Sequence, residues 1–90
     1  MSLAAPPGAA ERAEAAYRLL QGLLRVDTTN PPGNEAAAAE LIGRFLKNGG
    51  VEFRTLEKAP GRTNLIARIA GGRPGLLLAA HLDVVPAEPA

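Results

Sequence analysis

Residues 75–86 have the sequence GLLLAAHLDVVP, and this stretch decides how the rest of the chain is interpreted. Five consecutive apolar residues follow Gly75, a run short enough for a strand and apolar enough to be covered on both faces. Pro86 has no backbone N–H to donate, so strand pairing should end near it. We therefore predict a central strand that leaves the sheet as a loop.

This strand carries His81, the only histidine of the chain, and Asp83 two residues later. In extended backbone, residues i and i+2 point to the same side, so the imidazole and the carboxylate should lie together while Leu82 turns away. Burying both groups at a strand end costs desolvation free energy, which a divalent cation would offset. Neutral His81 would then bind the metal, and Asp83 would accept a hydrogen bond from the other ring nitrogen.

Two alternatives remain for these residues. His81 could be a histidine whose hydrogen bonds are satisfied inside a core, with Asp83 capping the following loop. They could also be an acid–base pair without metal, which is the weaker chemistry because no Ser or Cys nucleophile lies beside them.

The composition limits the size of the core and the classes of partner. Ninety residues make at most one domain, and only three of them are aromatic although 47% are hydrophobic, so the core should be thin. The net charge of +1, without a basic cluster, argues against nucleic acid. Because the chain has no cysteine, imidazole and carboxylate would have to hold any metal.

We expect neither an export signal nor a membrane span in this sequence. Residues 1–8 contain no positively charged segment followed by an apolar run, and no stretch is long enough to span a bilayer. We expect a cytoplasmic protein without a membrane partner.

Two helices are predicted before the sheet. The first covers Ala9 to about Val26 and is rich in strong helix formers. A loop over Asp27–Gly33, interpreted mainly as a connection and less as a substrate contact, separates it from the second. The second helix runs from an N-cap at Asn34 to Lys47, followed by Gly49 as a stop signal. It has the clearest apolar periodicity of the chain, at Ala38, Leu41, Ile42, Phe45 and Leu46.

Strands are predicted at Val51–Glu57 and Asn64–Ala70, from the alternation of apolar and polar residues. The sequence GGRPG at 71–75 predicts a tight reversal, so that the second strand and the central strand would form an antiparallel hairpin. The fold class is therefore α/β, with two amino-terminal helices packed on a small mixed sheet.

Two stretches also resemble a known family. Residues 80–87, AHLDVVPA, resemble the first metal-site motif of the zinc metallopeptidases that include aminoacylase, acetylornithine deacetylase, succinyl-diaminopimelate desuccinylase and glutamate carboxypeptidase. Residues 27–35, DTTNPPGNE, are similar to the loop that these enzymes carry between their first two helices. The predicted order of elements agrees from about Glu11 onward, so the resemblance covers nearly the whole chain.

The resemblance implies a function and assigns roles to the two residues. His81 would be a metal ligand in a site for two zinc ions, with cobalt or manganese as possible replacements, and Asp83 would be the catalytic-site residue that orients it. In the family the metals activate a water molecule that attacks the amide carbonyl of an N-acyl amino acid or short peptide. A homodimer through a second domain is also implied.

Family members have several hundred residues, and their remaining metal ligands follow this motif. We therefore expect residues 1–90 to be the amino-terminal portion of a metallopeptidase-like catalytic domain, the start of a di-zinc peptidase, and to be inactive alone. The alternative is a small non-catalytic α/β binding or assembly module. A portion of a catalytic domain should expose the apolar flanks of its central strand, whereas a complete small module should be monodisperse.

Overall fold

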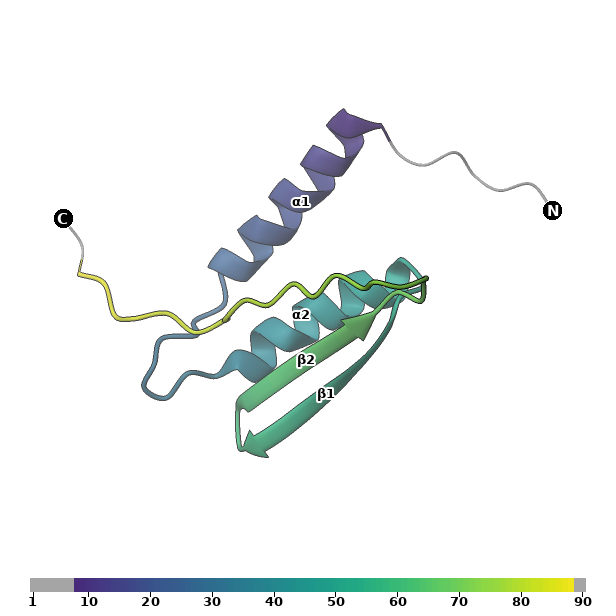
Figure 1. The fold of residues 1–90 in the computed structure, drawn as a ribbon. Helices are drawn as coiled ribbons and strands as arrows, with labels where there is room; N and C mark the ends of the chain where they lie inside the picture. The colour runs from purple at the N-terminus through teal and green to yellow at the C-terminus, as the bar shows by residue number, and fades with distance from the viewer. Residues whose placement is uncertain (1–7, 89–90) are drawn as a thin grey trace.

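The computed structural model describes residues 8–88, which form two helices followed by a hairpin (Figure 1). The elements are α1 (Ala9–Leu24), α2 (Glu35–Asn48), β1 (Glu52–Ala59) and β2 (Arg62–Arg68). Residues 1–7, on which the expectation of no export signal largely depends, lie outside the described part. Neither helix within residues 8–88 has the length and apolarity that crossing a bilayer requires.

The first predicted helix is confirmed, and it ends two residues before the predicted boundary. The helix α1 packs against α2, where an added Cβ at Gly22 would lie 2.9 Å from Leu41 Cδ2. No residue of α1 is buried, and its amino-terminal half projects away from the other elements (Figure 1). The helix is therefore held mainly at its carboxyl end.

The second predicted helix is also confirmed, and its start is satisfied differently from the prediction. Asn34 is the N-cap residue, but with φ 50° and ψ 42° its side chain makes no capping hydrogen bond. Instead, the Ala36 N–H donates to the Gly61 carbonyl at 3.0 Å. The turn of the hairpin thus satisfies one of the free N–H groups at the start of α2.

The end of α2 has the hydrogen bonds of a Schellman motif. The Val51 N–H donates to the Leu46 carbonyl at 2.9 Å, and the Gly50 N–H donates to the Lys47 carbonyl at 3.1 Å. The left-handed residue is Gly50, with φ +73°, whereas the predicted stop residue Gly49 has φ −87°. The predicted stop signal therefore marks the right place but not the residue with the special conformation.

The strands β1 and β2 pair antiparallel, with Glu52 opposite Arg68 and Ala59 opposite Arg62. The helix α2 covers one face of this hairpin, and the ring of Phe53 approaches Gly43 so closely that an added Cβ would lie 2.9 Å from Cζ. Among the described residues, the buried hydrophobic side chains are Ala38 and Ala39. The thin core predicted from composition is confirmed.

The prediction of a central strand is wrong for this chain. Residues 75–86 run as extended chain from the end of β2 back toward the α1–α2 loop, and their one sheet-type pairing is a parallel bridge between Thr29 and Val84 (Figure 1). Leu76, Leu77 and Leu78 are 86%, 88% and 83% exposed. The predicted hairpin between the second strand and this stretch is likewise replaced by the β1–β2 hairpin.

The physical reason is that a buried strand needs partners at both edges and cover on both faces. Within residues 8–88 this stretch has one bridge partner, and its Leu76–Leu78 run stays exposed. The α/β class with two amino-terminal helices and a small sheet is nevertheless confirmed.

Candidate functional site

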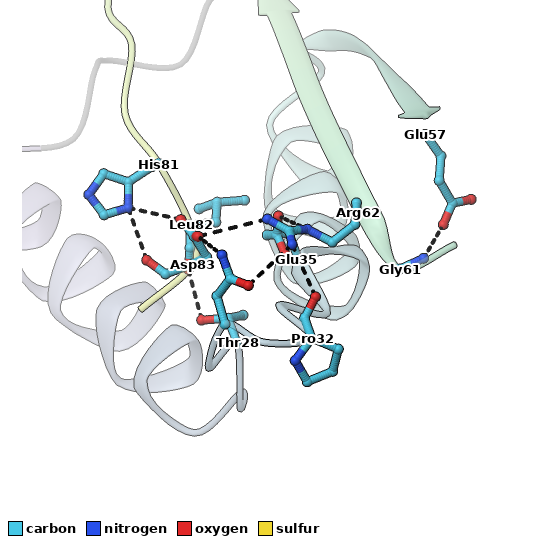
Figure 2. A network of polar contacts seen from close by, with 10 residues as sticks. Thr28, Pro32, Glu35, Glu57, Gly61, Arg62, His81, Leu82 and Asp83 are labelled. Atoms are coloured by element: carbon cyan, nitrogen blue, oxygen red, sulfur yellow. Dashed lines mark hydrogen bonds and ion pairs between the residues drawn. The ribbon is translucent and has the colours of Figure 1, made fainter. Parts of the chain in front are cut away.

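The loop between α1 and α2 holds the segment that carries His81 and Asp83. The Val84 N–H donates to the Thr28 carbonyl at 3.1 Å, and the Asn30 N–H donates to the Val84 carbonyl at 2.8 Å. The Thr28 hydroxyl, on a residue only 4% exposed, donates to the Leu82 carbonyl at 2.8 Å (Figure 2). Three hydrogen bonds thus fix the backbone on both sides of Asp83.

The predicted proximity of His81 and Asp83 is confirmed. His81 Nδ1 lies 2.9 Å from the Asp83 carbonyl oxygen and 3.2 Å from Asp83 Oδ1 (Figure 2). Because both oxygens are acceptors, this geometry favours the imidazole tautomer with its proton on Nδ1. The other nitrogen, Nε2, then carries a lone pair on a side chain that is 85% exposed. His81 is therefore not a core histidine.

The second carboxylate oxygen of Asp83 is held from the opposite side. Asn30 Nδ2 donates to Asp83 Oδ2 at 2.9 Å. Arg62 Nη2 lies 3.8 Å from the same oxygen (Figure 2). The hydrogen bond from Asn30 lowers the pKa of Asp83 below its ordinary value; burial opposes this effect and the contact with His81 adds to it. Asp83 is therefore an anion at neutral pH.

Arg62 connects three parts of the chain around this carboxylate. Its Nε donates to Glu35 Oε2 at 2.8 Å, and its Nη1 lies 3.1 Å from the Pro32 carbonyl and 3.4 Å from Asn30 Oδ1. The Glu35 side chain is 13% exposed, and its Oε1 is buried with no hydrogen-bond partner. The absence of a side chain at Gly33 makes room for this pair, because a Cβ there would lie against Glu35 Oε1 and 2.8 Å from Arg62 Nε.

The sequence did not identify these supporting residues. The prediction treats Asp27–Gly33 mainly as a connection, whereas Thr28 and Asn30 contact the His81 segment directly. A signal was present, since Asn30 and Asp83 lie in the two stretches that carry the family resemblance. Arg62 gave no such signal, because an arginine after a turn is usually solvated.

The described residues fit part of a metal site. His81 Nε2 is a single exposed nitrogen that could bind a metal ion. Asp83 contacts the other ring nitrogen, Nδ1, as carboxylates do behind metal-bound histidines. Within residues 8–88, no group of three or more His, Asp and Glu side chains is placed to hold a metal ion. Any complete zinc site would therefore need ligands from elsewhere.

Similarity to known proteins was found among curated sequences. No family model matches the chain, and no solved structure matches it. The acetylornithine deacetylase of Vibrio campbellii is 36% identical over 72 residues, which cover 78% of the chain and 19% of that enzyme. The succinyl-diaminopimelate desuccinylase of Rhodopseudomonas palustris is 37% identical over 75 residues, which cover 79% of the chain and 19% of that enzyme. The succinyl-diaminopimelate desuccinylase of a Methylobacterium species is 43% identical over 76 residues, which cover 80% of the chain and 19% of that enzyme.

The chain thus spans about a fifth of the length of the curated relatives it matches. The resemblance inferred from residues 27–35 and 80–87 is confirmed by these alignments. Over the aligned residues, the chain is therefore a homologue of the acetylornithine deacetylases and succinyl-diaminopimelate desuccinylases.

Proposed function

We propose that this chain is the amino-terminal part of the catalytic domain of a metal-dependent hydrolase. Its reaction would be cleavage of the amide bond of an N-acyl amino acid or a short peptide. Support comes from the relatives, whose names describe the removal of an acetyl group from acetylornithine and of a succinyl group from succinyl-diaminopimelate. A cytoplasmic location and a homodimer through a second domain belong to the same proposal.

The observation that carries this proposal is the contact of His81 Nδ1 with Asp83, which leaves an exposed Nε2 lone pair. His81 would bind one of two divalent ions, with zinc the first candidate and cobalt or manganese the others. Asp83 would hold the ring in the binding orientation and raise its basicity. When bound, such ions polarise a carbonyl group and lower the pKa of a bound water.

The proposal also assigns the remaining ligands to residues outside 8–88. A catalytic zinc normally has three protein ligands, and His81 supplies one of them. The exposed Leu76–Leu78 run is consistent with this arrangement, because a run of this kind usually lies inside a sheet covered on both faces. We therefore expect no amide hydrolysis from the 90-residue chain alone.

The first test is the mass of the gene product in its native cells, compared with the 9.3 kDa of this chain. The purified product, loaded with zinc, is then assayed on N-acetylornithine and N-succinyl-diaminopimelate. His81→Gln should abolish hydrolysis, since it removes a ligand, whereas Arg44→Lys on the exposed surface of α2 should not change it. Hydrolysis that survives both chelation and His81→Gln would refute the metal-ligand role.

A different result would favour the non-catalytic alternative. A native product of about 9 kDa that is monodisperse and inactive would be a small α/β binding or assembly module. Metal-dependent amidase activity of the 90-residue chain alone would contradict both readings, because neither provides it with enough ligands.

A further inference from the structure

We propose that Asn30 and Arg62 are positioning residues for the His81 site. They hold the Asp83 carboxylate so that His81 keeps its proton on Nδ1 and presents Nε2 to a metal ion. This inference rests on the function proposed above for the use of Nε2, but its geometric content stands on the described contacts alone.

The two oxygens of Asp83 have separate partners. Oδ2 accepts from Asn30 Nδ2 at 2.9 Å, and Oδ1 lies 3.2 Å from His81 Nδ1. Because a carboxylate is planar, fixing Oδ2 also fixes where Oδ1 lies. A hydrogen bond from Asn30 therefore determines whether the carboxylate faces the imidazole.

The amide of Asn30 is itself oriented by its two neighbours. Its Nδ2 faces the Asp83 carboxylate, and its Oδ1 lies 3.4 Å from Arg62 Nη1. Exchanging the amide oxygen and nitrogen would place an acceptor against the carboxylate and a donor against the guanidinium. Only one amide orientation therefore satisfies both contacts.

Arg62 in turn is held by several acceptors around its guanidinium group. Glu35 Oε2 lies 2.8 Å from Nε, and the Pro32 carbonyl lies 3.1 Å from Nη1. From this position Nη2 also reaches to 3.8 Å from Asp83 Oδ2, which adds a positive charge behind the carboxylate. A lysine has one compact ammonium group and lacks the fork that makes these contacts together.

A change at Asn30 should shift the imidazole tautomer only in part. The carbonyl of Asp83 is the closer acceptor for His81 Nδ1, at 2.9 Å. Backbone bonds with Thr28 and Asn30 hold Val84, and the Thr28 hydroxyl holds the Leu82 carbonyl. The carbonyl contact would remain after the side-chain contact is lost. We therefore expect a lower fraction of the Nδ1-protonated form, without complete inversion.

The experiment uses the complete gene product, stripped of metal and labelled with ¹⁵N-histidine. Above about pH 8, where imidazole is neutral, the two ring-nitrogen shifts report the tautomer of His81, which His81→Gln identifies by loss of its signals. Asn30→Asp keeps the acceptor toward Arg62 but replaces the donor toward Asp83 with an anionic oxygen. This substitution and Arg62→Lys should both lower the Nδ1-protonated fraction.

The same two variants should bind zinc more weakly in competition with a chelating indicator. The loss should be smaller than the roughly 10- to 100-fold effect of removing the hydrogen-bond partner of a metal ligand, because Asp83 and its carbonyl contact with His81 remain. The matched controls are Asn48→Asp at the exposed end of α2 and Arg44→Lys. They should change neither the Nδ1-protonated fraction of His81 nor the affinity for zinc. Because Asn30 and Arg62 touch, their combined effect should be smaller than the sum of the single effects.

A merely structural role would lower the melting temperature while the folded fraction kept its wild-type tautomer ratio. That result, in both Asn30→Asp and Arg62→Lys, would overturn the inference. Failure of the proposed function looks different: the wild type would neither bind zinc nor hydrolyse amides, while the tautomer ratio would still shift in the two variants. The tautomer measurement thus decides the positioning role without reference to activity.

Discussion

Asn30 Nδ2 donates a hydrogen bond to Asp83 Oδ2 at 2.9 Å, although 53 positions separate the two residues in the sequence. This contact joins the α1–α2 loop to the segment that carries His81. The backbone reinforces it, since the Asn30 N–H also donates to the Val84 carbonyl at 2.8 Å. The loop is therefore part of the candidate site.

The hydroxyl of Thr28 gives a test of this attachment. Thr28 is buried and its hydroxyl donates to the Leu82 carbonyl at 2.8 Å, so Thr28→Val removes one hydrogen bond at nearly constant shape. A loss of about 1 kcal/mol in local stability corresponds to roughly fivefold faster amide exchange at Val84, whose N–H donates to Thr28. Thr55→Val, at an exposed position of β1, is the control. Unchanged exchange in the Thr28 variant would show that the hydroxyl does not hold the segment.

The glycine pair after α2 gives a second prediction. Gly50 has φ +73° with open space around its Cα, so Gly50→Ala adds backbone strain alone and should destabilise the protein by about 1 kcal/mol. Gly49 has φ −87°, and an added Cβ would make only ordinary contacts there. Thermal unfolding should therefore show a lower melting temperature for Gly50→Ala and little change for Gly49→Ala. The reverse order would contradict the Schellman assignment.

Local signals in the sequence predicted the helices and the first two strands because each is defined by contacts close in the chain. The apolar period of α2 and the alternation in β1 do not depend on distant residues. The stretch 75–86 is different, because a buried strand exists only when other strands and helices cover it. Its apolar composition is a property of the sequence, whereas its pairing requires partners that residues 8–88 do not supply.

The contacts of the candidate site likewise include one that the local sequence predicts and others that depend on distant parts of the chain. The closeness of His81 and Asp83 follows from the two-residue period of extended backbone, so the sequence was sufficient to predict it. The contacts of Asn30 and Arg62 with Asp83 depend on how a loop and a hairpin meet. No apolar periodicity or turn signal in the sequence predicts these tertiary contacts.

The carboxyl group of Asp27 gives a prediction on pH. The Thr29 hydroxyl and then its backbone N–H, 3.0 Å from Asp27 Oδ1, lower the pKa of Asp27 below its ordinary 3.8, while burial opposes them. Because the folded-state pKa is depressed, this contact stabilises the fold above about pH 4 and is lost as the pH falls through the lower folded value. A carboxyl ¹³C titration should give a midpoint below 3.8.

Thr29→Val tests the cause of that shift. The substitution removes the hydroxyl, the larger contributor, and keeps the backbone N–H, so the midpoint of Asp27 should move only part of the way back to its ordinary value. Thr55→Val should not move it. A midpoint that stays at the wild-type value in Thr29→Val would assign the whole shift to the backbone.

The exposed Leu76–Leu78 run gives a prediction that tests the proposed place of this chain in a longer protein. In the 90-residue chain Leu77 is 88% exposed beside an unpaired backbone, which is a template for pairing with another copy. Leu77→Lys should therefore reduce self-association in sedimentation velocity, and Asn48→Lys, which adds the same charge at an exposed helix end, should reduce it less.

Leu77→Lys should be harmful instead of beneficial in a longer gene product in which this run forms a covered strand. There the lysine would have to be buried, so Leu77→Lys should destabilise the protein by several kcal/mol and lower its yield of folded material. Asn48→Lys should remain neutral in both contexts, because its position is exposed. If Leu77→Lys were equally neutral in the longer product, the run would not be a central strand, and the proposed place of this chain in a hydrolase domain would lose its structural support.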